Sequence, residues 1–327
     1  MPISSALPRA RVKLAGGLQA LPRMEFALAL ASPFSLDYTL ESGQLFRWTR
    51  KGESWYGVVG GSVLRARQEG EVLRCSSGSD QLDSDFVTKY FRLDDDLEHI
   101  LASLTKDDVI TRAIQKLYGL RLARQDRWEC LASFLLATNA NIPRISKMVS
   151  SICERYGKEL EFEGEKYYGF PDAVTLSEST LSDLNSCGLG YRSAFLKRVA
   201  TAVAGGRIDL SSFDSMSYEE ARKVLLKELL GEKILLGVGP KVADCVLLYS
   251  CGKDAAFPID VWIAKVLAES YPKLLGQALR RKYARDRKVK LSPGDYDRIS
   301  QRVRSYFGPY AGYAQQYLFM AAREELV

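Results

Sequence analysis

Histidine is nearly absent from the sequence, and cysteine occurs without the spacing that metal sites require. The 327 residues include one histidine, His99, and six cysteines that form no CxxC pair and no tight cluster. Structural zinc and iron–sulfur sites need several thiolates or imidazoles at short spacing, so we expect no metal and no other cofactor. The same pattern favours free thiols in a reducing compartment over a disulfide framework.

Long apolar runs are absent too. No stretch approaches the roughly 18 residues that a membrane-spanning helix needs, so we expect no membrane partner. Hydrophobic residues make up 46% of the chain and charged residues 26%, as is ordinary for a soluble globular protein. The net charge of +6 leans mildly toward polyanionic partners, although many enzymes without such a partner are as basic.

Acidic residues are missing from the first 23 positions, which carry Arg9, Arg11, Lys13 and Arg23. This composition would suit a transit peptide, but it lacks the hydrophobic region of a secretory signal. We expect residues 1–24 to be a disordered basic tail, or the product of a start upstream of Met24. The folded part then begins at residue 25.

Residues 25–105 are expected to form a small antiparallel β-rich domain. Short segments rich in aromatic and branched residues alternate with Gly and Ser, as in a meander of strands. These segments are "SLDYTL" (35–40), "QLFRWTR" (44–50), "SWYGVVG" (54–60), "SVLRARQ" (62–68) and "EVLRCSS" (71–77).

Residues 106–327 are expected to form a mainly α-helical domain. Apolar residues recur there at i, i+3, i+4 and i+7, in the segments 107–120, 127–139, 142–157, 192–206 and 217–231. Asp107, Ser217 and Asp260 stand where N-caps belong, and Gly231 and Gly252 follow helix ends. The sequence therefore predicts an α+β fold, with the β-rich domain followed by the helical one.

The stretch "LLGVGPKVADC" (235–245) predicts a helix–hairpin–helix, with a tight turn and a new helix from about Lys241. Gly237 and Gly239 can adopt positive φ and present bare backbone N–H groups beside the positive end of the second helix. Such a turn can hold a phosphate of a nucleic-acid backbone without reading sequence. A plain glycine-rich connection between two helices is the alternative.

Three residues in and after this turn could carry chemistry. Lys241 opens the second helix, and Cys245 lies one turn along the same face. Asp260 follows nineteen residues after the lysine, in "PIDVW", where it is also placed to cap the next helix. Capping alone would account for that carboxylate.

With these residues the sequence resembles the helix–hairpin–helix DNA glycosylases that have a Gly/Pro…Asp loop, and most of all the 8-oxoguanine DNA glycosylases among them. The resemblance runs from about Leu36 to Phe319. The motifs that carry it, in matching order, are "SGQLFRW", "KYFRLD", "RLARQDRWECL", "TNANIPRI", "YYGFP", "GLGYR", "SYEEA", "GVGPKVADC", "PIDVW" and "GPYAGYAQQYLF".

The resemblance implies that Lys241 is the nucleophile and Asp260 its essential partner. Cutting an N-glycosidic bond develops positive charge on the sugar, which a nearby carboxylate stabilises. A neutral amine can attack C1′ and leave a Schiff base that permits β-elimination of the 3′ phosphate. Deprotonation of an amine requires burial or a cationic neighbour, and the turn at the cleft would supply the burial.

The damaged base must leave the duplex to be reached. By resemblance, the backbone carbonyl of Gly43 accepts from N7–H, which distinguishes 8-oxoguanine from guanine. Phe319 and Cys245 would sandwich the base, and Gln315 would contact its Watson–Crick edge. From the residues alone, Gly43 is a turn, Phe319 a core residue and Gln315 a surface position on the same helical face as Phe319.

Four further positions match the family's contacts to the opposite base and the gap in the duplex. They are Asn139, Arg144, Tyr191 and Arg192. Arginine donors suit cytosine, whose N3 and O2 are acceptors. From spacing alone, "TNANIPRI" is a helix–loop–helix junction with Asn as a cap.

This sequence departs from the family at several points. Trp262 stands where a histidine often contacts phosphate, and we expect its indole to pack against Asp260 and the hairpin instead. Tyr249 replaces a flexible apolar residue near the base pocket, and "KELLGEK" lengthens the helix before the hairpin. The basic run at 280–290 could touch DNA, although a solvated loop explains it as well.

The predicted enzyme is a monomeric, intracellular DNA N-glycosylase and lyase whose partner is double-stranded DNA containing 8-oxoguanine opposite cytosine. It would work in the nucleus of a eukaryote or the nucleoid of a prokaryote. Two alternatives remain: a glycosylase for another lesion, and a non-catalytic DNA-binding module. Related thymine-glycol and adenine enzymes usually carry a four-cysteine iron–sulfur cluster, which the sequence lacks, and phosphate binding alone needs neither Lys241 nor Asp260.

Overall fold

The computed structural model describes residues 24–230, 237–277, 279–281 and 291–326. The N-terminal part contains β1 (Met24–Ala29), α1 (Leu36–Glu41), β2 (Trp48–Lys51), β3 (Ser54–Val59), β4 (Ser62–Glu69), β5 (Val72–Ser77), α2 (Ser84–Tyr90) and α3 (Leu97–Leu104). The predicted basic tail lies outside these residues except for Met24, which begins β1.

The remaining elements are mostly helical. They are α4 (Asp108–Lys116), α5 (Arg127–Leu136), α6 (Ile142–Tyr156), β6 (Glu159–Phe162), β7 (Glu165–Tyr168), α7 (Ala173–Glu178), α8 (Leu181–Ser186), α9 (Arg192–Ala204), the 3₁₀ turn η1 (Leu210–Asp214), α10 (Tyr218–Leu230), α11 (Pro240–Cys251), α12 (Val261–Ser270), α13 (Pro272–Leu275), α15 (Pro293–Phe307), η2 (Gly308–Tyr310) and α16 (Ala311–Arg323). The α+β class is therefore confirmed.

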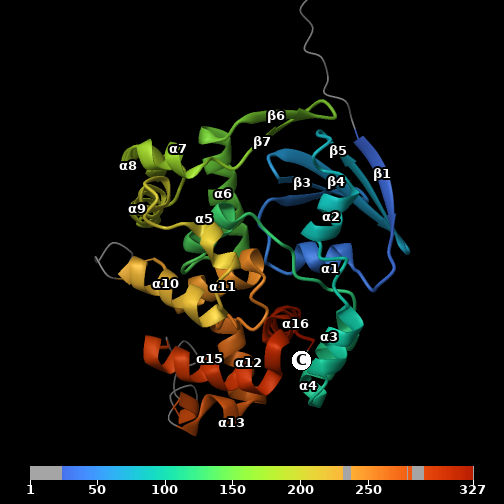
Figure 1. Ribbon diagram of the computed structural model, residues 1–327, viewed down its shortest axis with the longest axis vertical. Coiled ribbons are helices and arrows are strands. Elements are labelled where there is room, and N and C mark those ends of the chain that lie inside the picture. Colours follow the sequence, from blue (N-terminus) through green and yellow to red (C-terminus); the bar gives the residue numbers. More distant parts are fainter. Residues whose placement is uncertain (1–23, 231–236, 278, 282–290, 327) are drawn as a thin grey trace, which may run out of the picture.

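The N-terminal strands form one antiparallel sheet in the order β1-β5-β4-β3-β2 (Figure 1). Period-two alternation buries Leu64 and Ala66 of β4 and Leu73 and Cys75 of β5. These side chains pack with buried residues of α1 and α2. The two short helices therefore close the apolar side of the sheet.

The prediction of a strand at residues 35–40 is wrong, because this segment forms α1. Ser35 caps the helix by accepting from the Tyr38 N–H at 3.2 Å. Its buried residues, Leu36, Thr39 and Leu40, have the i, i+3, i+4 spacing of a helix and not the alternation of a strand. The segment 44–50 is a strand only from Trp48, and β1 and α2 were not among the predicted elements.

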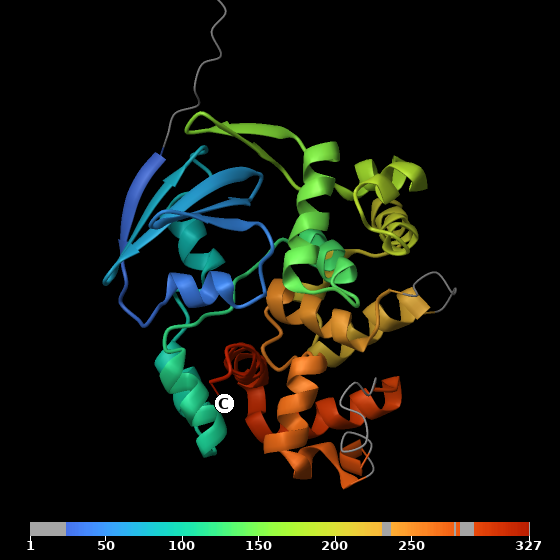
Figure 2. The ribbon, with the colours of Figure 1, turned by 180° about the vertical axis from the view of Figure 1, so that it is seen from behind.

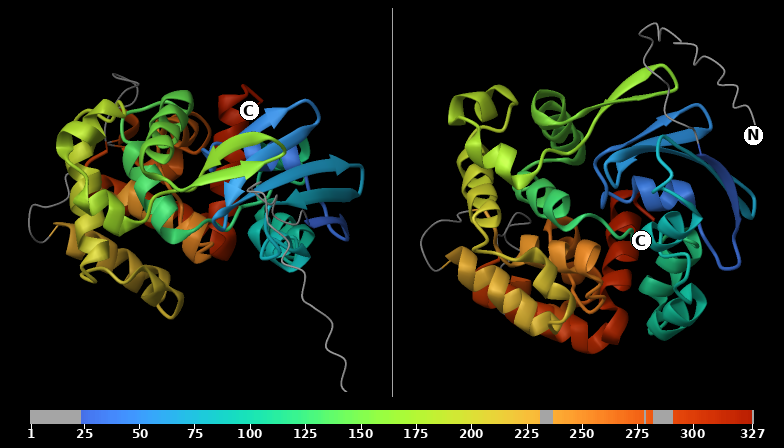
Figure 3. Two further views of the ribbon diagram at one scale, coloured as in Figure 1. Left: turned by 90° about the horizontal axis from the view of Figure 1, so that it is seen from above. Right: turned by 45° about the horizontal axis from the view of Figure 1, so that its top comes forward.

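The helical part contains a hairpin that the sequence analysis did not predict. Strands β6 and β7 pair across Glu163 and Gly164, which both have positive φ. Figure 3 shows this hairpin reaching from the helices toward the sheet. There Lys51 of β2 forms an ion pair with Glu165 and lies 5.1 Å from the Tyr167 ring centre.

A single large core joins helices from both ends of the chain. It contains buried residues of α3, α4, α5, α9, α11, α12, α15 and α16. Figure 2 shows α16, the last helix, lying between α12 and the early pair α3 and α4. No helix in the described ranges is both long and apolar enough to cross a bilayer.

The predicted helix ends at Asp107, Ser217, Asp260 and Gly252 are confirmed. Ser217 and Glu220 form a capping box, with Ser217 N–H donating to Glu220 at 2.8 Å. Gly252 adopts the left-handed conformation, φ 62°, after α11. Gly231 lies outside the described residues, as do most of the run 280–290 and the end of the "KELLGEK" segment.

Candidate active site

Lys241 lies in the first turn of α11, directly after the glycine turn of residues 237–239. Gly239 caps this helix without a side-chain acceptor, and Pro240 occupies its first position. The half-buried Lys241 ammonium lies 4.9 Å from the ring centre of Phe134 on α5. The cation therefore contacts an aromatic face at the hairpin end of the core.

Asp260 caps α12 and accepts from the Ile263 N–H at 2.9 Å. Burial raises the pKa of its carboxyl above the ordinary value. The positive charge of Lys241 is the largest opposing influence, followed by backbone N–H groups of the first helical turn. The cap and the electrostatic partner of Lys241 are thus the same carboxylate, so the two interpretations of Asp260 are compatible.

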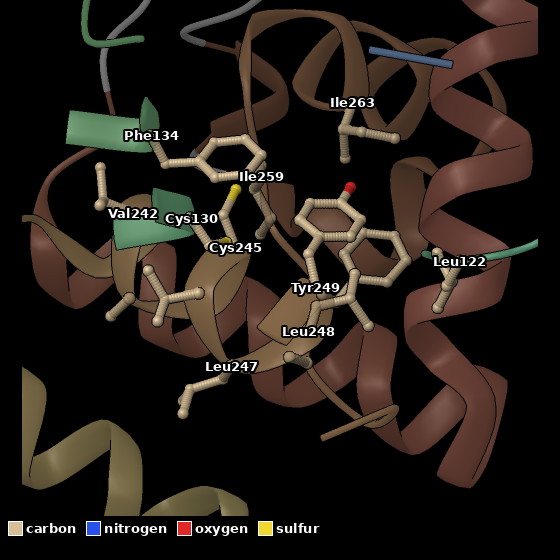
Figure 4. Close-up of a cluster of buried hydrophobic side chains, with 14 of the residues drawn as sticks. Leu122, Cys130, Phe134, Val242, Cys245, Leu247, Leu248, Tyr249, Ile259 and Ile263 are labelled. Carbon is tan, nitrogen blue, oxygen red and sulfur yellow. The ribbon is translucent and has the colours of Figure 1, made fainter. Parts of the chain in front are cut away.

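Cys245 lies four residues after Lys241 and is buried. Burial raises the pKa of its thiol to about 11, against the lowering influence of Lys241. Figure 4 shows Cys245, Phe134 and Tyr249 in one buried cluster. The Tyr249 ring stacks on Phe134 with the ring centres 5.3 Å apart. Lys241 therefore stands at one end of a layer of aromatic rings.

A buried carboxylate connects α11 to three other segments. Asp244 accepts from the Tyr218 hydroxyl at 2.8 Å, from Arg222 Nε at 2.8 Å and from the Tyr296 hydroxyl at 2.7 Å. The Tyr296 hydroxyl also accepts from the Ile259 N–H at 3.1 Å. This network holds the helix of Lys241 against the residue that precedes Asp260.

Gly43 and Phe319 lie together. A Cβ at Gly43 would stand 3.2 Å from Phe319 Cε1 and 2.8 Å from Ile142 Cδ1, and the glycine has a φ of 77°. The short contacts and the positive φ both explain why a glycine stands at position 43. Its neighbour Gln44 is buried and donates to the Arg121 carbonyl at 2.8 Å, while its Oε1 accepts from the Ala123 N–H at 2.7 Å. The turn is therefore fixed through Gln44 to the segment between α4 and α5.

Gln315 is buried on α16, one turn before Phe319. The Tyr249 hydroxyl lies 3.3 Å from its Oε1 and 2.5 Å from Oε1 of Gln316, whose Nε2 donates to the Ser42 carbonyl at 2.7 Å. The surface position expected from spacing is thus wrong for Gln315. The structure links it to Tyr249 on α11 and, through Gln316, to the residue before Gly43.

The two glycines of the turn before α11 differ in how much space surrounds them. The expectation of positive φ is wrong for Gly239, which is extended at φ −97°. Gly237 is buried, and a Cβ there would stand 2.9 Å from the Phe195 ring. Close packing on α9 therefore excludes a side chain at Gly237, while the space around Gly239 is open.

The residues matched to the opposite base gather at the loop after α5. Asn139 and Arg144 are exposed, and 51% of the Tyr191 side chain is exposed. Asn139 donates to the Tyr191 hydroxyl at 3.2 Å, and that hydroxyl donates to the Thr138 carbonyl at 3.1 Å. Tyr191 is thus a braced aromatic ring on the surface.

Arg192 differs from its neighbours because it is buried. Its guanidinium donates to the Thr138 carbonyl at 3.0 Å through Nε and to the Asn139 carbonyl at 3.1 Å. Thr138 in turn donates to the Gly237 carbonyl at 3.5 Å. Arg192 therefore holds the loop that carries Asn139 near the hairpin.

Trp262 lies in the first turn of α12. Its side chain is 37% exposed, beside Val261, which is 72% exposed. Ile263, the next residue, is the buried one in this turn. The two positions after the Asp260 cap are therefore the exposed ones of this turn, and the packing of Trp262 against Asp260 and the hairpin stays a prediction.

Several residues of the site carried no recognisable signal in the sequence. Phe134, Asp244, Gln316 and Tyr296 lie in ordinary helical patterns, and only their contacts reveal them. In the described part of the chain, no group of three or more His, Cys, Asp or Glu residues could hold a metal ion. The groups that converge here are an amine, carboxylates, amides and aromatic rings.

Comparison with known proteins identifies this arrangement. Residues 28–131 match the family model for the 8-oxoguanine DNA glycosylase N-terminal domain. An N-glycosylase/DNA lyase of Saccharomyces cerevisiae is 31% identical over 88% of this chain and 83% of its own length.

Two solved structures share the fold. The structure of MBOgg1 with a low-affinity DNA ligand has a TM-score of 0.80 and 33% identity, over 92% of this chain and 96% of that one. The Clostridium acetobutylicum 8-oxoguanine glycosylase/lyase, bound to double-stranded DNA with cytosine opposite 8-oxoguanine, has a TM-score of 0.78 and 32% identity, over 90% and 93%. The chain thus belongs to the 8-oxoguanine DNA glycosylase family and is a bifunctional N-glycosylase/DNA lyase.

Proposed function

We propose that this enzyme excises 8-oxoguanine paired with cytosine and then cleaves the DNA strand, with Lys241 as the nucleophile. The observation that carries the proposal is the pairing of Lys241 and Asp260 at the N-termini of two successive helices, α11 and α12. The charge of Lys241 acts directly on the Asp260 carboxyl. Because its substrate is cellular DNA, the enzyme would be located inside the cell, together with that DNA.

The neutral Lys241 amine attacks C1′ of the damaged nucleotide, and the N-glycosidic electron pair leaves with the base. As the bond breaks, positive charge on the sugar is stabilised by the Asp260 carboxylate. A proton lost from the attacking nitrogen passes to the departing base, and opening of the sugar ring, with O4′ protonated by water, gives a Schiff base. Removal of a C2′ proton then expels the 3′ phosphate by β-elimination. Phe134 supplies an aromatic face beside the amine.

The base would enter between Gly43, Phe319 and Cys245. Gly43 has no side chain to keep N7–H from its carbonyl, and a Cβ at this position would stand only 3.2 Å from Phe319 Cε1. An 8-oxoguanine base donates from N7 where guanine accepts. The Gly43 carbonyl thus favours the lesion by one hydrogen bond and opposes guanine by one repulsion.

The strand that carries cytosine would meet the loop after α5. In the described ranges the Arg144 guanidinium makes no ion pair or hydrogen bond, so it is available as a donor to cytosine N3 and O2. The braced, exposed Tyr191 ring is suited to fill the gap that the flipped base leaves. Arg192 would act here with Asn139, whose backbone it holds. The N-terminus of α11, which begins after Gly239 without a side-chain cap, suits a phosphate.

Borohydride trapping tests the lysine mechanism. The parent enzyme, incubated with a duplex that carries one 8-oxoguanine opposite cytosine, should give a stable protein–DNA adduct when the Schiff base is reduced. Lys241→Gln should give none. Lys265→Gln removes an exposed lysine from α12 and should trap like the parent. Trapping by the Lys241 variant at the parental level would assign the nucleophile to another amine.

Asp260→Asn separates its two roles. The amide oxygen can still accept from the Ile263 N–H, so the cap is kept and the charge is lost. We expect DNA binding and folding to persist and base excision to fall by orders of magnitude. Glu269→Gln, on an exposed position of the same helix, is the matched control. Retained excision in Asp260→Asn would reduce this residue to a helix cap.

A further inference from the structure

Only one end of the Gln315 amide has a polar neighbour among the described residues. Its side chain is 3% exposed, and among the described residues its amide contacts only the Tyr249 hydroxyl. A buried amide can donate twice through its nitrogen and accept through its oxygen. The end that faces away from Tyr249 is therefore the end left for the flipped base. Whether that end is the amide oxygen or the amide nitrogen decides which base edge fits.

Tyr249 cannot serve both glutamines with its single proton. Its hydroxyl lies 2.5 Å from Oε1 of Gln316 and 3.3 Å from Oε1 of Gln315. The Gln316 amide is fixed in its orientation because its Nε2 must donate to the Ser42 carbonyl, 2.7 Å away. The shorter contact takes the proton, so the Tyr249 oxygen faces Gln315 with lone pairs.

A lone pair opposite a carbonyl oxygen is repulsive, whereas a lone pair opposite an amide NH₂ accepts a hydrogen bond. A half-turn of the terminal amide exchanges the two atoms at nearly the same positions. We infer that Tyr249 and Gln316 hold the Gln315 amide with Nε2 donating to Tyr249 and Oε1 presented to the base. Both are positioning residues, because they act on the substrate through Gln315.

The consequence is a pocket that selects hydrogen-bond donors. An 8-oxoguanine base offers N1–H and its 2-amino group to the Gln315 oxygen. In 8-oxoadenine the N1 atom is an acceptor and would oppose that oxygen. Because 8-oxoadenine has the same N7–H and O8, the Gly43 carbonyl treats the two lesions alike. This inference rests on the proposed function and adds the basis on which guanine-type lesions are chosen.

Two substitutions disturb the arrangement in different ways. Gln316→Leu removes the acceptor that takes the Tyr249 proton, so the hydroxyl donates to Gln315 and turns its Nε2 toward the base. Tyr249→Phe keeps the stack on Phe134 but leaves the amide free to rotate. Selectivity for 8-oxoguanine should therefore fall most in Gln316→Leu and less in Tyr249→Phe.

The experiment compares kcat/KM for duplexes with 8-oxoguanine or 8-oxoadenine, each opposite cytosine. We expect the ratio of the two to fall by about tenfold in Gln316→Leu, since correct pairing of a base edge has that order of effect. Tyr317→Phe removes another buried hydroxyl of α16, which donates to the Leu120 carbonyl at 2.9 Å. This control should lose stability and keep the ratio.

An unchanged ratio in both Tyr249→Phe and Gln316→Leu would overturn the inference while leaving 8-oxoguanine excision intact. Gln316→Met repeats the test with a flexible side chain if the leucine variant does not fold. A parent enzyme that releases no 8-oxoguanine would instead overturn the proposed function and this inference with it. An equal fall of the ratio in Tyr317→Phe would assign the effect to general loosening of α16 and would also overturn it.

Discussion

Replacement of Asp244 tests whether the buried network beneath Lys241 determines stability. Its side chain is 0% exposed, and that of Arg222, its ionic partner, is 15% exposed. Two tyrosine hydroxyls donate to the same carboxylate. Removal of one member of a buried ion pair typically destabilises by about 3–5 kcal/mol, because the other charge is left uncompensated. Arg222 retains a second pair with Asp297, at 2.7 Å, which lowers the expected cost.

The two simplest substitutions should differ in magnitude. Asp244→Asn keeps one oxygen for Tyr218 and Arg222 but turns an NH₂ toward Tyr296, whose hydroxyl proton then has no acceptor. One buried unsatisfied group costs about 1–3 kcal/mol, so we expect a loss of about 2 kcal/mol. Asp244→Ala removes both carboxylate oxygens, and with them all three hydrogen bonds, and should lose about 4 kcal/mol.

Urea unfolding followed by tryptophan fluorescence measures these losses as a shift of the midpoint. Tyr296→Phe should cost less in the Asp244→Asn background than in the parent, because the hydroxyl has already lost its acceptor. Asp297→Asn, on the exposed side of the network, should change the free energy of unfolding by no more than about 0.5 kcal/mol. Single-turnover excision should slow in Asp244→Asn, since Tyr296 also holds the residue before Asp260.

Two results would refute this reasoning. One is an Asp244→Asn protein as stable as the parent, which would mean that the buried carboxylate gains nothing over an amide. The other is an equal loss in Asp244→Asn and Asp244→Ala, which would mean that the retained oxygen makes no contribution and the hydrogen-bond geometry is misassigned.

Three further outcomes are expected. Gly237→Ala should destabilise by about 1–3 kcal/mol in a thermal melt because a Cβ would press on Phe195, whereas Gly239→Ala should be almost silent; a reversed order would contradict the packing argument. Excision should fall on acidification at a pH above the ordinary aspartate range, because burial raises the pKa of Asp260 and only its ionised form stabilises the sugar. Single-turnover rates measured against pH test this, and a rate that stays unchanged down to the ordinary aspartate range would contradict it. Arg144→Ala should reduce the preference for cytosine over the other opposite bases by about 1–3 kcal/mol in kcat/KM, and unchanged preference would remove Arg144 from the site.

Local rules in the sequence were sufficient for much of the helical part. The caps at Asp107 and Asp260 and the left-handed Gly252 follow from the intrinsic preferences of those residues at helix ends. The turn that ends at Gly239 and the start of α11 at Pro240 followed from glycines and a proline placed between two apolar helices. Each of these features depends on residues within one or two turns of the chain, so the sequence alone could predict it.

Short segments were harder because their periodicity is brief. The pattern of residues 35–40 predicts a strand, and the capping contact of Ser35 decides for the helix α1. The hairpin of β6 and β7 was missed because it is stabilised partly from outside, by contacts such as the ion pair between Lys51 and Glu165. Sequence separation of 114 residues hides that contact from any local pattern.

The functional groups show the same division. The sequence and its resemblance selected Lys241 and Asp260, which stand at the starts of α11 and α12. Only the tertiary structure decided that Arg192 holds a loop, and that Tyr249 lies between Gln315 and Gln316. Those contacts join segments more than 50 residues apart, where packing of whole helices, and not local preference, determines which polar atoms meet.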